Sequence, residues 1–179
     1  IAVFSNAGSQ LWGTYFELGG SPNVHGLAVG TDGRLVVQAT HSPDAFTPLA
    51  TGVFAGAYQN SATGEGDACL IGFNAAGTVQ WRTQLGGTVT EQCSTEQQLA
   101  MDACGNIYTT YEALGFGVQP NVPLLSGGCN STFDGVYGDG DPANSYGGDM
   151  VLMRFTPNGA LTWSTFHSGP WDDHRSAMT

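Results

Sequence analysis

Apolar and polar positions alternate along this chain in short runs, and almost every run ends in a turn-forming residue. The runs are rich in Val, Thr, Phe, Tyr and Trp, and Gly, Asn or Asp stand between them. Period-two alternation over so few residues, bounded by turn formers, predicts β-strands joined by tight turns. We expect ten strands, at Ile1–Ser5, Leu11–Glu17, Val24–Val29, Arg34–Thr40, Ala68–Asn74, Thr78–Gln84, Gln97–Asp102, Asn106–Tyr111, Met150–Phe155 and Ala160–Phe166.

One segment recurs three times without a gap, with the pattern F-x-x-x-G-x-x-x-W-x-T. Each copy reads as a β-hairpin, in which apolar strands flank a short polar turn and the Gly suits a positive φ. The Phe and Trp fall on the strands, where large rings can fill the gap between stacked sheets. The repeated positions are Phe4, Gly8, Trp12 and Thr14, then Phe73, Gly77, Trp81 and Thr83, then Phe155, Gly159, Trp163 and Thr165.

A second repeated hairpin lies between these copies. Leu27–Val37 matches Leu99–Thr109, and a third copy begins at Trp171–Thr179. One full period therefore holds two hairpins, or four antiparallel strands. Such a unit repeated in tandem is typical of a propeller blade, and it is longer than the usual ~40–50 residues because its middle connections are long.

The repeats predict an all-β fold, namely a β-propeller fragment made of four-stranded antiparallel blades, with two complete blades and a partial blade at each end. Residues 1–20 would be the C-terminal half of a preceding blade, 21–87 blade A, 88–169 blade B with a long insertion loop at 112–147, and 170–179 the start of a following blade. Because a blade cannot bury its faces without neighbours, we expect the remaining blades to belong to a longer chain.

Together these segments resemble the bacterial SBBP-type β-propeller repeats over nearly the whole chain. That family has a D-x-x-G-N-x-Y-V turn, a stretch like F-P-x-x-x-G-A-Y-Q, a G-x-D-A-F-x-x-K-F strand and a closing G-x-L-x-W-S-T-Y-x-G-G. The corresponding segments are Asp102–Tyr108, Phe46–Pro48 with Gly56–Gln59, Gly66–Phe73 and Gly148–Phe155, and Gly159–Phe166. Two features depart from the family: blade B has a Cys-bearing insertion in place of Gly-Ala-Tyr-Gln, and Gly72 or Arg154 replaces the usual Lys.

The resemblance implies a large secreted or cell-surface bacterial protein. Members often accompany adhesion domains, gliding-motility proteins and C-terminal sorting domains of type IX secretion. The partners implied are the remaining blades of the same chain, surface or secretion-machinery proteins, and glycans.

Charge narrows the set of partners. The formal net charge is -11, and all four basic residues are Arg. Nucleic acids and anionic membrane surfaces are bound through Lys and Arg, so neither is an expected partner. No apolar run reaches the ~18 residues that a membrane-spanning helix needs, so membrane insertion is not expected either.

The most acidic loop contains the candidate metal ligands. Asp134, Asp139 and Asp141 are interspersed with Gly, which allows carboxylates and carbonyls to fold round one hard cation. Calcium is therefore the one candidate cofactor. The EF-hand spacing is absent, and the alternative is a solvated, turn-rich loop.

No catalytic site is predicted, and the protein is expected not to be an enzyme. The sequence contains no G-x-S-x-G, H-E-x-x-H, P-loop or dinucleotide-binding fingerprint. His25 and His174 occupy matching repeat positions just before an inner strand, which favours a structural role for both.

The four cysteines permit disulfides, and blade topology limits which pairs can form. Cys93 at the start of blade B and Cys129 in its long loop belong to the same end of the sheet. Cys104 lies in a turn at the opposite end, about 23 Å from Cys93, which is too far for a bridge. Cys93–Cys129 is therefore the candidate disulfide, and buried free thiols are the alternative.

These observations lead to one main hypothesis and two rivals. The main hypothesis is a structural or interaction propeller, with recognition carried by the loops 41–66 and 112–147. The first rival is a propeller enzyme acting on extracellular glycans, a hydrolase or lyase with its site in missing blades. The second is an exported cargo captured with its transporter.

Overall fold

The computed structural model describes residues 1–15, 23–41, 67–86, 90–93, 98–114, 125 and 148–167. These residues form β-strands and connecting turns, and among them no helix could span a membrane. The strands of the described residues are β1 (Ala2–Phe4), β2 (Gln10–Gly13), β3 (Asn23–Val29), β4 (Leu35–His41), β5 (Asp67–Phe73), β6 (Val79–Leu85), β7 (Thr90–Gln92), β8 (Leu99–Met101), β9 (Ile107–Leu114), β10 (Gly148–Phe155) and β11 (Leu161–His167).

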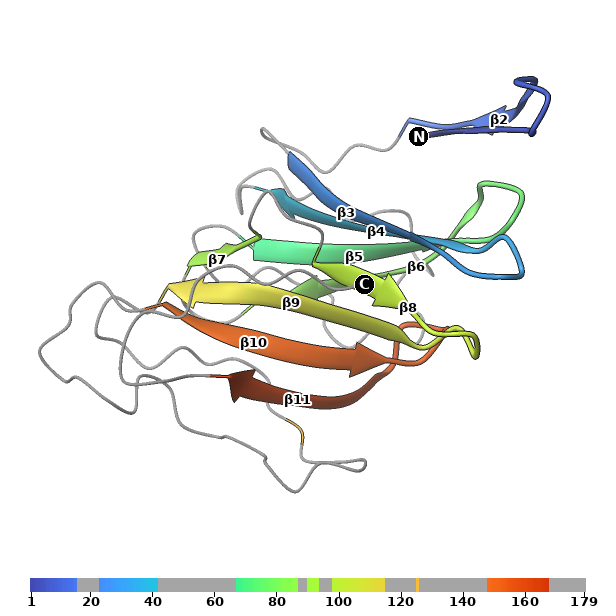
Figure 1. Ribbon diagram of the computed structural model, residues 1–179. Coiled ribbons are helices and arrows are strands. Elements are labelled where there is room, and N and C mark those ends of the chain that lie inside the picture. The colour runs from blue at the N-terminus through green and yellow to red at the C-terminus, as the bar shows by residue number, and fades with distance from the viewer. Residues whose placement is uncertain are drawn as a thin grey trace, which may run out of the picture.

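These strands form three antiparallel sheets that lie one above another in Figure 1. Strands β1 and β2 make a two-stranded hairpin, and sheet A contains β3, β4, β5 and β6 in sequence order. In sheet B, β11, β10 and β9 are neighbours in that order, and β7 and β8 both pair with the free edge of β9. Both larger sheets are thus four strands wide, which confirms the all-β prediction and the four-stranded antiparallel unit.

All ten expected strands are present, and β7 is an eleventh that the sequence did not predict. Strand β7 pairs with the last residues of β9, whereas β8 pairs with its first residues. The edge strand of sheet B is therefore divided into two pieces. Its residues, Thr-Glu-Gln, are all polar and give no alternating pattern. For this reason the pattern of apolar positions alone could not find it.

Five short turns of the described residues share one geometry and gather at the same end of the sheets (Figure 1). In each turn, the backbone N–H of the first residue donates to the carbonyl oxygen of the residue four positions later. The N–H of the Gly three positions after the first residue donates to the carbonyl oxygen of that first residue. That pattern is a type I turn followed by a bulge residue, which requires a positive φ. The glycines at this place are Gly8, Gly33, Gly77, Gly105 and Gly159, with φ between 79° and 81°.

A β-bulge occurs at the same place in three hairpins, and it turns Trp12 and Trp81 toward the next sheet. In sheet A, Phe73 pairs with Val79 but Gly72 pairs with Trp81, so Gln80 has no partner across the strand. The hairpins β1–β2 and β10–β11 have the equivalent shift. Because an extra residue reverses the facing of the residues after it, Val79 packs on one face of sheet A and Trp81 on the other.

Apolar side chains cover both faces of sheet A. On the face toward sheet B, Val36 and Leu70 join a buried cluster with residues of all the long strands of sheet B. On the opposite face, Val37 and Ile71 pack under the hairpin β1–β2, through Trp12. A sheet that is buried on both sides needs a neighbour on each side, which makes stacking the basis of this fold.

The turn glycine Gly159 should tolerate a side chain much less than Gly105, although both have the same backbone conformation in sheet B. A Cβ at Gly159 would lie 2.6 Å from ring carbons of Trp81, whereas the nearest atom to a Cβ at Gly105 would be Cγ of Pro157, at 3.2 Å. We expect Gly159→Ala to lose ~2–4 kcal/mol of unfolding free energy, from the positive φ and the overlap together.

The control variant Gly105→Ala should lose only ~1–2 kcal/mol, from the positive φ. Urea unfolding followed by fluorescence measures both variants. Equal losses in the two would show that the indole contact adds nothing to the backbone effect.

Candidate functional site

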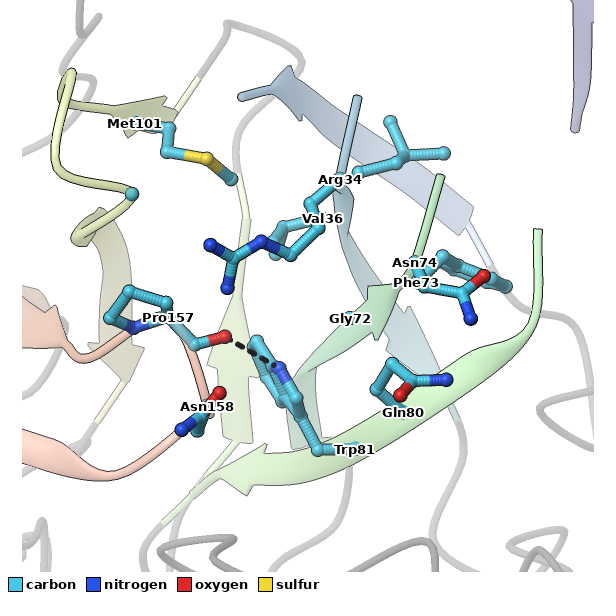
Figure 2. A pocket seen from close by; sticks show the side chains of 12 residues that line it. Arg34, Val36, Gly72, Phe73, Asn74, Gln80, Trp81, Met101, Pro157 and Asn158 are labelled. Atoms are coloured by element: carbon cyan, nitrogen blue, oxygen red, sulfur yellow. Dashed lines mark hydrogen bonds between the residues drawn. The ribbon is translucent and has the colours of Figure 1, made fainter. Parts of the chain in front are cut away.

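The joint between sheets A and B is built round the indole of Trp81. Its Nε1 donates a hydrogen bond to the carbonyl oxygen of Pro157 at 3.1 Å, in the β10–β11 turn (Figure 2). The ring lies over Gly159 of that turn and also covers Gly72 of its own sheet, where an added Cβ would overlap it. The indole is almost wholly buried. This one side chain thus packs on two glycines and also donates a hydrogen bond to a carbonyl of the next sheet.

The same joint occurs between the β1–β2 hairpin and sheet A. Trp12 Nε1 donates to the carbonyl oxygen of Ala75 at 2.9 Å, and the ring lies over Gly77. Ala75 and Pro157 occupy the same position in their turns, one residue after the turn begins. The Phe, Gly and Trp positions of the three repeats, nine residues in all, lie in the described part of the chain. Six of them form these two joints: Trp12, Phe73, Gly77, Trp81, Phe155 and Gly159.

A buried polar contact ties the two sheets together deeper in the interface. The Nε2 of Gln38, on β4, donates to the carbonyl oxygen of Thr110, on β9, at 2.8 Å. Both residues are buried, so the bond forms in a region of low dielectric, where losing it would leave polar groups unpaired. Sequence reasoning missed this contact, because nothing in a single Gln in a strand points to the sheet it will meet.

A pocket of about 150 Å³ opens beside the Trp81 joint, among the turns of both sheets. Its walls are largely apolar, with Val36, Phe73, Trp81 and Met101 prominent among them, and Asn74, Gln80 and Asn158 provide amides (Figure 2). Pockets that hold drug-sized ligands measure about 300–1,000 Å³, so this one has room only for a small molecule or for one side chain of a partner.

Arg34 supplies the one charged side chain among the described residues that line this pocket. Its Nε contacts Asp32 Oδ2 at 2.5 Å, and its backbone N donates to Asp32 Oδ1 at 3.1 Å. These hydrogen bonds, led by the one from the backbone, lower the pKa of the Asp32 carboxyl below its ordinary value. The carboxylate is thereby held ionised beside its partner, so it lacks the accessible proton that a general acid requires.

The remaining predicted site residues lie partly outside the described part of the chain. The candidate calcium ligands Asp134, Asp139 and Asp141 and the half-cystine candidate Cys129 fall there, so these predictions stand as made. The Cys93–Cys129 disulfide stays a prediction. In this structure Cys93 is buried with a free thiol, the alternative that the sequence left open, and burial raises the pKa of that thiol. Within the described ranges, no three His, Cys, Asp or Glu side chains come together as a metal site.

The structure gives His25 the kind of role that its repeat position indicated. Its Nε2 lies 2.9 Å from the hydroxyl oxygen of Thr40, on the neighbouring strand β4. The contact joins two strands of one sheet at the end opposite the short turns, and it assists their pairing there.

Comparison with protein-family models and with curated proteins adds no relative. No protein-family model matches this sequence. A search of curated proteins likewise finds no match.

The indole hydrogen bond of Trp81 should contribute to stability separately from the ring's packing. We expect Trp81→Phe to lower the unfolding free energy by ~2 kcal/mol, because the Pro157 carbonyl loses its donor in a partly buried place. Trp81→Ala should cost ~3–5 kcal/mol, since it also removes the buried ring.

Trp12→Phe is the matched control, because its hydrogen bond is exposed to solvent. It should cost less than ~1 kcal/mol. Chemical denaturation of the three variants under one set of conditions gives the comparison, and a Trp81→Phe loss no larger than that of Trp12→Phe would contradict it.

Asp102 should make the β8–β9 turn sensitive to acid. Its carboxylate accepts hydrogen bonds from the Asn106 amide at 2.8 Å, from the backbone N of Asn106 and Cys104, and from the Tyr108 hydroxyl. The side-chain bond from Asn106 leads in lowering its pKa below the ordinary 3.8. A carboxyl whose folded pKa is lowered stabilises the fold above its unfolded pKa, and this stability is lost as the pH falls through the folded value.

The variant Asp102→Asn should keep the turn and lose this pH dependence, because Asn74 accepts the equivalent backbone bonds in the β5–β6 turn. Urea midpoints measured from about pH 6 to about pH 2.5 should fall more steeply for the wild type than for the variant. Parallel curves would mean that the Asp102 carboxylate adds no acid sensitivity.

Proposed function

We propose that sheets A and B are neighbouring blades of a β-propeller, and that the protein is a non-enzymatic binding scaffold of a larger secreted or cell-surface bacterial protein. The observation that carries this proposal is the repeated joint: Trp12 to Ala75 and Trp81 to Pro157, at matching positions of successive sheets. A contact that recurs in this way can add further blades without a new kind of interface.

The placement of the connections supports a division of labour between the two ends of the sheets. The short turns occupy one end, and the joints fix them. Strand β4 ends at His41 and β5 begins at Asp67, and β9 ends at Leu114 while β10 begins at Gly148, all at the other end. Residues 42–66 and 115–147 therefore start from a rigid edge, which is where binding loops are usually placed.

The chemistry of the chain favours a neutral or basic partner. Its net charge of -11 repels nucleic acids and anionic surfaces, so a surface glycan or a basic face of a surface protein fits best. In this proposal the acidic positions Asp134, Asp139 and Asp141 lie within one binding loop, where a calcium ion would order them. Adhesion at the bacterial surface, with export by the type IX route, is the role we assign.

Loop replacement tests this function directly. The purified chain is screened on an array of bacterial and host surface glycans and on immobilised extracellular matrix proteins, with about 1 mM CaCl₂ or with EDTA. Replacing 115–147 or 42–66 by Gly–Ser linkers of equal length should lower binding at least tenfold, while the wild type binds in calcium.

The control is Asn158→Ala, which changes the opposite end of the sheets beside the Trp81 pocket. It should leave binding unchanged, and circular dichroism confirms that each variant folds. Binding that survives both loop replacements, binding lost equally in the control, or depolymerisation of a glycan would overturn the scaffold proposal, the last in favour of an enzyme.

A further inference from the structure

The pocket beside the Trp81 joint contains a cation that its place in the repeat does not require. In each of the five short turns one residue directly follows the glycine of positive φ, and these residues are Ser9, Arg34, Thr78, Asn106 and Ala160. Arg34 is the one charged residue of this set. The four other turns have the same geometry with small or neutral residues there, so turn formation does not explain the Arg.

The equivalent residue of sheet B shows what differs at Arg34. The side-chain amide of Asn106 folds back on its own turn and donates to Asp102 Oδ2 at 2.8 Å. In sheet A, Gly30 stands in the place of Asp102, and a Cβ added there would lie 2.8 Å from Sδ of Met101. The first position of this turn therefore offers no carboxylate, and the Arg34 side chain extends across the joint toward sheet B (Figure 2).

The guanidinium of Arg34 is held at one edge and open at the other. Its Nε contacts Asp32 Oδ2, and Asp32 Oδ1 accepts the backbone N–H of Arg34. The two terminal nitrogens point toward Met101 and Pro157 (Figure 2), and among the described residues neither has a hydrogen-bond partner. A guanidinium that is fixed at Nε and open at both terminal nitrogens can receive a carboxylate end-on, through two parallel hydrogen bonds.

The pocket next to these nitrogens is lined by apolar side chains. Val36, Phe73 and Trp81 are almost wholly buried there, and Met101 is partly buried. Apolar cavities of about 150 Å³, the size of this pocket, hold a molecule as large as benzene. A short aliphatic chain therefore fits beside the guanidinium.

We infer that this pocket binds a carboxylate on a short, branched aliphatic chain. The carboxylate accepts hydrogen bonds from both terminal nitrogens of Arg34, and the aliphatic part lies between Met101 and Trp81. A free branched-chain acid has this chemistry, and so does a peptide C-terminus that ends in Leu. The site lies at the short-turn end of the sheets and uses none of the loop residues 42–66 and 115–147, so the inference does not rest on the scaffold proposal.

The acidic net charge of -11 is compatible with a small anion at this place. Repulsion between exposed charges is largely screened beyond about 8 Å at physiological ionic strength. Of the described residues that line the pocket, Arg34 alone is charged, and Asp32 takes only its Nε edge. A monoanion therefore meets one local cation, whereas a polyanion such as a nucleic acid would meet the whole acidic surface.

A titration followed by ¹H–¹⁵N NMR tests the site on the whole chain. The probe is 3-methylbutanoate, and the indole N–H of Trp81 reports its binding because this side chain lines the pocket. We expect a saturable shift with a Kd of about 0.1–10 mM, as suits a ligand of so few atoms. The indole N–H of Trp12 belongs to the other joint and should not move. Trp81→Phe and Trp12→Phe assign the two signals.

Matched ligands separate the charge from the apolar contact and identify the source of the carboxylate. 3-Methylbutanamide keeps the shape without the charge, and acetate keeps the charge without the chain. Each should bind about tenfold more weakly than 3-methylbutanoate. Acetyl-Gly-Gly-Leu, with its C-terminal amide as control, tests a chain end. If this peptide binds at least as tightly as the free acid, the ligand is a C-terminus, and if it binds more weakly, the ligand is a free acid.

Variants test the assignment to Arg34. Arg34→Gln should weaken binding of 3-methylbutanoate by about tenfold or more. Arg34→Lys keeps the charge but loses the two-pronged donor, so it should weaken binding about threefold. Arg154→Gln is the matched control, because it removes the same charge at a residue that stacks on Tyr108, outside the lining of this pocket, and it should bind like the wild type. Urea midpoints verify that each variant folds.

Three results would overturn the inference. They are no saturable shift of the Trp81 indole up to about 50 mM acid, equal binding of the acid and its amide, and equal weakening by Arg34→Gln and Arg154→Gln. Failure of this site leaves the scaffold proposal standing, because the loops that test that proposal lie at the other end of the sheets. Loss of loop-mediated glycan binding bears in turn on the scaffold proposal alone.

Discussion

The fold depends on one interaction, an indole that crosses from one sheet to the next and lies on a glycine. Three local conditions produce it. A bulge directs Trp81 outward, a turn with positive φ places Gly159 where no Cβ obstructs the ring, and the carbonyl of Pro157 accepts the N–H. Phe could fill the space but could not satisfy the carbonyl, and any other residue at the turn would meet the ring. Trp and Gly are thus required as a pair, in different sheets.

Two-sided burial makes this joint necessary. In an open antiparallel sheet one face commonly meets water. In sheet A, however, the consecutive residues Val36 and Val37 point to opposite faces and are both buried, Val36 toward sheet B and Val37 toward the hairpin β1–β2. The buried bond from Gln38 to Thr110 fixes the lateral position of the sheets, because apolar contacts alone would allow them to slide. Apolar packing therefore stacks the sheets, while the indole and amide bonds set their register.

The sequence was informative wherever a local pattern determined the structure. The strands, the turn glycines and the place of the Phe and Trp rings on the flanking strands followed from periodicity and a gap-free repeat, since these are properties of neighbouring residues. The sequence did not reveal the bulge, because all three hairpins contain it and their sequences align without a gap. The polar strand β7 and the contact between Gln38 and Thr110 depend on distant partners, which no local pattern encodes. Asp134, Asp139, Asp141 and Cys129 lie outside the described residues, and their roles stay predictions.

The repeat also provides an internal standard for exposure. Phe4, Phe73 and Phe155 have the same sequence context and the same place in a hairpin, so they differ chiefly in whether a sheet precedes them. Of the three, Phe4 alone is exposed, although burying an aromatic ring of this kind contributes about 1.5–3 kcal/mol. Burial of this ring therefore depends on contact with another sheet, as the clusters round Phe73 and Phe155 show, and the hairpin does not achieve it alone.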